Sequence, residues 1–319
     1  MIENCSWFPF SDEPVVRSLW YVPRFSSPKV ILPSDSPDGR WHMFVDSVLG
    51  IHHFISDSGI AWEPNKVVVA RGHYPSIYKE NGKFYLVYEV HGFSLSYRQF
   101  DKSRKNSKIG ICSSDDLFAW SEPRIVLDGE NVSYADFSGR KILSFPQIVK
   151  MQSGLYRLYF SASVRVLPDS KQKVGKFFGY AEATDLDSEF TVPENSLLLK
   201  TSRDDKCADA ATGSISLFTD GDIFYGLQCG YFWDEVEKRT SSAVFLLKSK
   251  DGNSFERCSG NPLIMPQSGS WAGQYIRSCS INYMKDENCF YCYFSACGEK
   301  ESFFLKESIG LFIGNPRQY

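Results

Sequence analysis

The chain has 319 residues, a formal net charge of −3, 43% hydrophobic residues and 15% aromatic residues. This balance supplies apolar surface for a large core and provides no basic field for nucleic acid or for an anionic membrane. No apolar run approaches the roughly 20 residues of a membrane-spanning helix, and the opening MIENCSW lacks the basic and apolar regions of a signal peptide. We therefore expect a cytoplasmic protein that binds neither nucleic acid nor membranes.

A five-fold internal repeat predicts the fold. Each copy has a short apolar strand, a turn, an aromatic strand, a loop and a further apolar strand. The short strands centre on Val30, Ile77, Ile148, Ile215 and Ile281, and the aromatic strands with their turns occupy 39–44, 82–88, 154–160, 221–227 and 287–293. One small sheet cannot bury its own face, so such repeats pack radially. We predict an all-β, single-domain, five-bladed propeller whose four-stranded antiparallel blades surround a central funnel.

The blades follow one another along the chain at about 21–70, 71–128, 140–200, 210–264 and 275–319. The last copy has no room for a fourth strand after Gly314. A propeller avoids a free edge by closing its ring. We therefore expect residues 14–20 to pair with 309–313 and close the last blade.

Nine cysteines are present, and Cys289, Cys292 and Cys297 are spaced closely enough to suggest a metal cluster. Residues 289–294 have the pattern of a strand, in which successive side chains alternate between faces. Cys289 and Cys292 would then point to opposite sides, and the same argument separates His52 from His53. We predict buried free thiols, no metal and no cofactor.

The loops predict which face of the propeller is functional. Strands in a blade are antiparallel, so one face receives the loops after the second and fourth strands. These loops are the long ones, at 89–107, 128–144, 163–176, 200–212, 230–241 and 265–277. Long loops gathered on one face of a rigid scaffold usually carry the site, so we expect it at the mouth of the funnel.

Charged and aromatic residues flank the inner strands at this mouth. Carboxylates, bases and exposed rings around one cavity suit a sugar, because rings stack on its C–H face and charged donors bind its hydroxyls. The candidate substrate-binding residues are Arg24, His73, Arg165, Arg277, Trp233, Trp271 and Tyr275. Alternatively, the arginines neutralise funnel carboxylates, His73 is a buried structural histidine, and the aromatics pack between blades.

The segments YPSIYKENGKFYLVYE and FPQIVKMQSGLYRLYFS, with the turn SDSGIAW, resemble the five-bladed propeller glycosidases of glycoside hydrolase families 43, 32, 68 and 130. The resemblance covers nearly the whole chain. It implies an Asp at the start of the inner strand in blades 1 and 2, as in family 43, but residues 24–29 and 72–76 contain none. Instead the ring is rich in cations, which resembles the phosphate-handling sites of family 130: Arg24, Lys29, His73, Arg140, Arg165 and Arg277.

Glycosyl transfer needs a proton donor to the leaving oxygen, and a base, a nucleophile or a bound phosphate. Asp209 is the first candidate, because the small residues after it allow close approach of a ligand; the alternative is a loop cap or an ion pair. Glu89 ends an apolar strand, where burial favours a protonated carboxyl; the alternative is an ion pair with an arginine such as Arg165. Asp46 and Asp136 are further candidates, and each has the same structural alternative.

These residues favour a carbohydrate-active enzyme, an inverting glycoside hydrolase or phosphorylase acting on a small glycoside, anionic glycosides included. Its ligand would be a small carbohydrate or a sugar phosphate. The missing Asp residues favour an alternative, a catalytically inactive propeller that binds a glycan or a sugar phosphate. The cations favour another, a sugar-modifying transferase or lyase of polysaccharide or metabolite biosynthesis.

Overall fold

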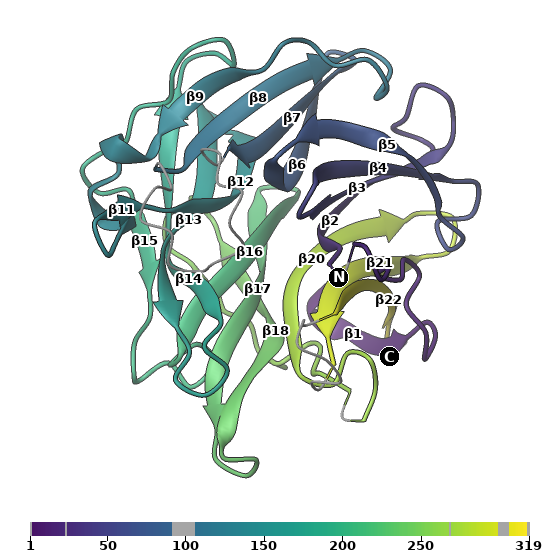
Figure 1. Ribbon diagram of the computed structural model, residues 1–319, viewed down its shortest axis with the longest axis vertical. Coiled ribbons are helices and arrows are strands. Elements are labelled where there is room, and N and C mark those ends of the chain that lie inside the picture. Colours follow the sequence, from purple (N-terminus) through teal and green to yellow (C-terminus); the bar gives the residue numbers. More distant parts are fainter. Residues whose placement is uncertain (1, 23, 91–105, 268, 299–305, 318–319) are drawn as a thin grey trace.

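The computed structural model describes residues 2–22, 24–90, 106–267, 269–298 and 306–317. Within these ranges, five four-stranded antiparallel sheets surround a common centre, with one strand of each sheet innermost (Figure 1). The prediction of an all-β five-bladed propeller is confirmed. No helix in these ranges is long and apolar enough to cross a membrane.

Each blade runs from an inner strand to an outer strand. Blade 1 contains β2 (Ser26–Ile31), β3 (Trp41–Ser47), β4 (Gly50–Ser56) and β5 (Glu63–Ala70). Blade 2 contains β6 (Gly72–Glu80), β7 (Lys83–Val90), β8 (Lys108–Ser114) and β9 (Arg124–Asp128). Blade 3 contains β12 (Leu143–Lys150), β13 (Tyr156–Val166), β14 (Lys173–Ala183) and β15 (Leu197–Lys200). Blade 4 contains β16 (Ala211–Asp220), β17 (Ile223–Asp234), β18 (Arg239–Ser249) and β19 (Glu256–Arg257). Blade 5 contains β20 (Tyr275–Met284), β21 (Cys289–Cys297), β22 (Glu307–Pro316) and the N-terminal strand β1 (Cys5–Pro9).

The ring is closed by β1 (Cys5–Pro9), which pairs antiparallel with β22. Our prediction that residues 14–20 form this strand is wrong, because that segment bridges to β22 only at Val16, opposite Ile309. The side chain of Trp7 explains why residues 5–9, and not residues 14–20, pair with β22. A Cβ atom at Gly314 would lie 2.7 Å from the Trp7 ring, so the glycine of β22 makes room for this indole.

Five buried clusters each lie between two neighbouring blades, which is where the flat side chains of the aromatic strands pack. Strand β21 shows the alternation. Cys289 belongs to the cluster shared with blade 1, and Cys292 belongs to the cluster shared with blade 4. All nine cysteines are free, and within the described ranges no group of three or more metal-binding side chains comes together.

Two of the predicted long loops are largely strands. Strands β13 and β14 extend through most of residues 163–176, and β17 and β18 extend through most of 230–241, so both connections are narrow hairpins. The predicted long loop at 128–144 is an insertion between blades 2 and 3. It contains two single-turn 3₁₀ helices, Gly129–Asn131 and Ser133–Ala135, and the hairpin of β10 (Asp136–Phe137) and β11 (Arg140–Lys141).

Candidate functional site

Each inner strand has a β-bulge at the same level, close to the mouth of the funnel. The register shifts lie at Ser26/Lys29, His73/Ser76, Ser144/Gln147, Ala211/Ser214 and Ile276/Ser278. A bulge adds a residue to one strand and changes the direction of its side chain, and bulges are frequent next to active sites. The five bulges therefore form a ring of specially oriented residues around the axis.

Several bulge residues have a left-handed backbone that is unfavourable for bulky side chains. The φ angles are 54° at Ser27, 54° at Tyr74, 52° at Phe145 and 75° at Gly213. Such conformations cost about 1–3 kcal/mol each and gather at functional sites. A proline follows Ser27, Tyr74 and Phe145. Because an interior strand tolerates proline only at its start or at a bulge, this proline is the sequence signal that would have found the ring.

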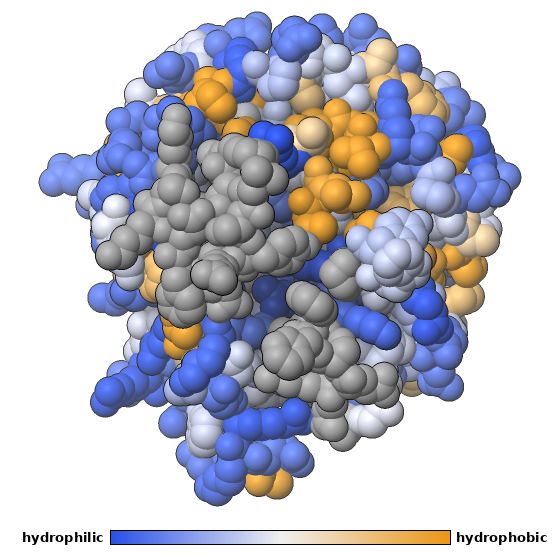
Figure 2. Space-filling model, viewed as in Figure 1, coloured by the Kyte–Doolittle hydropathy of each residue, from blue (hydrophilic) through white to orange (hydrophobic). Residues whose placement is uncertain are grey.

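A cavity of about 340 Å³ opens above the bulges. Figure 2 shows a hollow near the middle of this face, with hydrophilic atoms at its bottom and hydrophobic residues beside it. The rings of Tyr74 and Phe145 are 4.2 Å apart between centroids, and both residues also line a smaller axial space of about 40 Å³ below. The two rings thus form the floor of the cavity. Lys29 lines the lower space, where burial lowers the pKa of its ammonium group.

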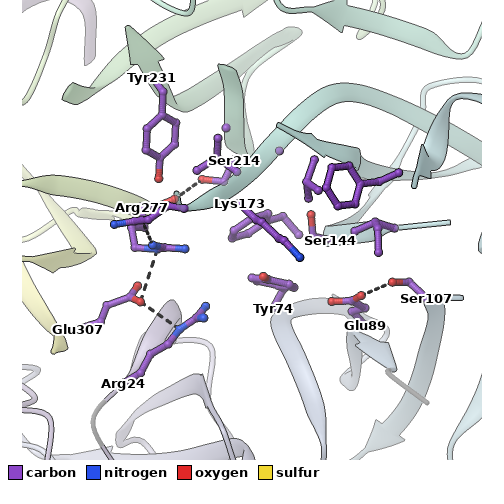
Figure 3. A pocket seen from close by; sticks show the side chains of 18 of the residues that line it. Arg24, Tyr74, Glu89, Ser107, Ser144, Lys173, Ser214, Tyr231, Arg277 and Glu307 are labelled. Carbon is purple, nitrogen blue, oxygen red and sulfur yellow. Dashed lines mark hydrogen bonds and ion pairs between the residues drawn. The ribbon is translucent and has the colours of Figure 1, made fainter. Parts of the chain in front are cut away.

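Glu307, at the start of β22, is the centre of one wall of the cavity. Its side chain is 4% exposed, its Oε1 accepts a hydrogen bond from the Ser26 hydroxyl, and its Oε2 lies 3.0 Å from Arg24 Nε and 3.5 Å from Arg277 Nε (Figure 3). Burial lowers the pKa of Arg24 and of Arg277, but Glu307, together with Asp46 and Tyr74 at Arg24 and with Tyr231 at Arg277, outweighs burial and holds both pKa values above the ordinary one. Arg277 also donates a hydrogen bond to Gln172.

Asp46 lies behind this wall at the end of β3. Its side chain is 1% exposed, and its Oδ2 lies 3.4 Å from His73 Nδ1 and 3.8 Å from an Arg24 nitrogen. Burial alone would raise the pKa of Asp46. The hydrogen bond from His73 and the charges of Arg24 and His73 together outweigh burial and hold that pKa below its ordinary value. Asp46 therefore remains an anion that orients Arg24 and His73.

Glu89, at the end of β7, lies on another wall. Figure 3 shows it on the far side of Tyr74 from Glu307. Glu89 is 1% exposed and accepts a hydrogen bond from the Ser107 hydroxyl. In the register of blade 2 it stands opposite His73 on the inner strand, so the strand pairing fixes its position at the mouth. Glu89 and Glu307 are thus two buried carboxyl groups on different walls of one cavity.

The cavity brings together some of the predicted site residues. Arg24, Arg277 and Glu89 line it. Asp46 lies against Arg24, and His73 lies against Asp46. The remaining predicted residues are Asp136, Asp209, Arg165, Trp233, Trp271 and Tyr275, and none is part of the described lining.

The first candidate from the sequence, Asp209, has a structural contact of its own. Its Oδ1 accepts a hydrogen bond from the backbone N–H of Trp233, at 2.9 Å. Trp271 stacks on Phe294 with ring centroids 5.6 Å apart, and Tyr275 is 1% exposed. These contacts match the structural alternatives, loop capping and packing. Asp136 and Arg165 are both exposed.

Several lining residues were missed from the sequence. They are Ser107, Phe137, Ser144, Phe145, Gln172, Lys173, Ser214 and Glu307. Glu307 is the most consequential of them. It begins the third strand of its blade, a place where we did not look for mouth residues, because we considered only the residues before the first strand and after the second.

Fold and site together define a five-bladed propeller with a buried, arginine-rich pocket on its axis. No protein-family profile matches the sequence, and no curated protein is detectably similar to it.

Solved structures share the fold, which confirms the resemblance to five-bladed glycosidases at that level. One, a BT0996 RGII complex, is 13% identical, with a TM-score of 0.68 over 98% of this chain and 92% of that one. A thermostable family-43 glycoside hydrolase is 14% identical, with a TM-score of 0.58 over 91% and 88%. Zg3597, a family 117 glycoside hydrolase produced by the marine bacterium Zobellia galactanivorans, is 13% identical, with a TM-score of 0.59 over 98% and 91%. At these identities the likeness establishes architecture, and function has to be argued from the pocket.

Proposed function

We propose that this protein is a carbohydrate-active enzyme that cleaves the glycosidic bond of a small glycoside with inversion at the anomeric carbon. The observation that carries the proposal is the pair of buried carboxyl groups, Glu89 and Glu307, on different walls of one cavity (Figure 3). Inverting glycosidases use two carboxyl groups that flank the scissile bond. A cavity of about 340 Å³ is in the range of small-ligand sites. The fold shared with named glycoside hydrolases supports the same reaction class.

Glu89 is assigned as the general acid, since burial disfavours the charged form of a carboxyl group and the Ser107 hydroxyl fixes one of its oxygens. In hydrolysis, the oxygen of a water molecule bonds to the anomeric carbon as the glycosidic C–O bond breaks. The proton of Glu89 passes to the leaving oxygen, and the Glu307 carboxylate accepts the proton of the water.

Phosphorolysis is a second candidate, and the contacts of Glu307 favour it. Two guanidinium groups, from Arg24 and Arg277, lie against one oxygen of this carboxylate, and the Ser26 hydroxyl donates to the other, so both oxygens are already engaged. A bound phosphate needs no base, because its own oxygen is already anionic, and arginine is well suited to bind it. In that case a phosphate oxygen bonds to the anomeric carbon, Glu89 again protonates the leaving oxygen, and the product is a sugar 1-phosphate.

The test is a screen of aryl glycosides and short oligosaccharides with and without inorganic phosphate, read by proton NMR. Inverted reducing sugar supports hydrolysis, and a sugar 1-phosphate formed only with phosphate supports phosphorolysis. Glu89→Gln should lower kcat by about 10²–10⁴-fold, while Glu122→Gln, an exposed glutamate of the same blade, should leave kcat unchanged.

Two results would overturn the assignment. One is full activity of Glu89→Gln. The other is tight binding of sugars with no turnover of any glycoside, which would make the protein a carbohydrate-binding propeller.

A further inference from the structure

We infer that the wall of the cavity beside blade 3 is an anion subsite, built by Arg140 and Lys173 around Phe137, for a negatively charged substituent on the bound sugar. The inference rests on the proposed function in taking the ligand to be a sugar. It adds the substrate class, which is a glycoside that carries a carboxylate, phosphate or sulfate group.

The first argument is the charge of the cavity. Its described lining contains four cationic side chains and two carboxylates. The cations are Arg24, Arg140, Lys173 and Arg277, and the carboxylates are Glu89 and Glu307. This positive excess lies within a protein whose net charge is −3. A cleft of one sign concentrates ligands of the opposite sign.

The second argument is the location of the excess. Arg24 and Arg277 are both opposed by Glu307, and Arg24 is opposed again by Asp46. Arg140 is partly buried, and its guanidinium group makes no hydrogen bond or ion pair with any other described residue. The guanidinium group of Arg140, on the blade 3 side of the cavity, is therefore without a counter-charge among the described residues.

The third argument is that this wall is preorganised. In the β10–β11 hairpin Phe137 pairs with Arg140, across a tight turn whose two residues have positive φ angles. Lys173 Nζ lies 5.3 Å from the centroid of the Phe137 ring, so the ring fixes the ammonium group beside the hairpin (Figure 3 shows Lys173 pointing into the cavity). Backbone and hydroxyl bonds tie the hairpin region to its neighbours: Ser163 donates to the Asp136 carbonyl, and Ser107 donates to the Lys141 carbonyl.

A guanidinium group next to an ammonium group matches the chemistry of an oxyanion, because the planar fork of arginine binds two oxygens while lysine supplies a point charge. Apolar side chains, Ile142, Val164 and Val174, share this side of the lining. A sugar ring with one charged substituent presents both surfaces that this wall requires, C–H groups and an anion.

Isothermal titration calorimetry at constant ionic strength tests the inference without any need for turnover. The probes are D-glucuronate and D-galacturonate, glucose 6-phosphate, galactose 6-sulfate, inorganic phosphate, and neutral D-glucose and D-galactose. The proteins are the wild type, Arg140→Gln, and a charge-matched control, Arg124→Gln. The control removes a surface arginine that is outside the cavity lining and pairs only with an exposed aspartate among the described residues.

We expect at least one charged sugar to bind about tenfold or more tightly than its neutral counterpart. Arg140→Gln should weaken that binding by about 10- to 100-fold, as expected for a hydrogen bond to a charged group. It should leave neutral sugars unchanged, and Arg124→Gln should change nothing. The charged sugar that binds best identifies the substituent as a carboxylate, a phosphate or a sulfate.

Three outcomes would overturn the inference. They are equal affinity for charged and neutral sugars, no effect of Arg140→Gln, and binding of inorganic phosphate alone among the anions. These outcomes are separable from failure of the proposed function. An enzyme that cleaves neutral glycosides through Glu89 refutes only the anion subsite, and selective binding of acidic sugars without turnover refutes only the enzymatic assignment.

Discussion

Lowering the pH from 7 to 5 should destabilise this protein through His53, the central group of a buried relay in blade 1. Asp38 Oδ1 lies 2.8 Å from His42 Nε2, and His42 Nδ1 lies 2.8 Å from His53 Nε2. At the other end, Asn65 Nδ2 lies 3.0 Å from His53 Nδ1. Both rings are fully buried. Every hydrogen bond in this relay has one donor and one acceptor when both histidines are neutral. Burial, followed by the charges of His42 and Lys66, lowers the pKa of His53 to about 3, and Asp38 opposes this shift only weakly.

The magnitude follows from linkage between protonation and folding. The pKa of His53 is about 3 in the folded chain and 6.5 in the unfolded chain, so the unfolded state binds the proton more tightly. Its contribution to stability is complete above pH 6.5 and is lost as the pH falls toward 3. Between pH 7 and pH 5 the loss is roughly 2 kcal/mol. Carboxyl groups that are ionised in the folded chain contribute little in this window, because they remain mostly ionised at pH 5 even in the unfolded chain. A carboxyl group that is protonated in the folded chain contributes equally to the wild type and to a His53 variant.

Urea unfolding followed by tryptophan fluorescence at pH 7 and pH 5 measures this loss. In His53→Gln the amide can still donate to His42, so the variant should fold and should lose roughly 2 kcal/mol less than the wild type over the same pH step. His52, whose pKa burial also lowers, contributes equally to both proteins. Equal pH dependence of the two proteins would refute the reasoning.

Three further predictions concern stability. Gly213→Ala should lower the free energy of unfolding in urea by at least about 3 kcal/mol, because its Cβ would lie 1.9 Å from a backbone carbonyl oxygen. The control Gly139→Ala has a similar φ and open space around its Cβ, so it should cost only about 1–2 kcal/mol. Glu307→Gln should lower stability by about 2–3 kcal/mol, because it removes the carboxylate that opposes Arg277 and leaves Arg24 only the more distant Asp46. Glu13→Gln, in an exposed pair, should change stability by less than about 1 kcal/mol. Deleting residues 1–10 removes β1 and exposes the edge of β22, so we expect a lower Tm and association detectable by light scattering; an unchanged, monomeric variant would contradict the ring-closing role of β1.

The architecture could be predicted from the sequence because it depends on a repeated pattern. Val30, Ile77, Ile148, Ile215 and Ile281 all fall within inner strands, since the alternation of short apolar strands and turns is a local signal that recurs five times. The closing strand was misplaced because any short apolar segment near the N-terminus satisfies the same pattern. Only the fit of Trp7 over Gly314 distinguishes residues 5–9, and that contact joins the two ends of the chain.

The site was harder to predict, because its residues come together through strand register and not through local motifs. Asp209 attracted attention by its loop of small residues, yet its carboxylate is engaged by a backbone N–H. Glu307 has no local motif and becomes visible only when the third strand of blade 5 is placed beside the bulges of blades 1 and 5. Glu89 lines the cavity because β7 ends at the mouth, and its catalytic role stays a prediction.

The strained bulge positions of the inner strands in blades 1 and 2 carry no carboxylate. The inner-strand segments of blades 1 and 2 contain no Asp, and Ser27 and Tyr74 occupy the strained bulge positions. The carboxyl groups come from the neighbouring strand: Asp46 pairs with Ser26, and Glu89 pairs with His73. Two aromatic residues in left-handed conformations cost free energy, so their position calls for a compensating role. Tyr74 and Phe145 provide one by closing the floor of the cavity. A pocket closed below and walled by blades suits a small glycoside or the end of a chain, and this geometry supports the substrate size that we propose.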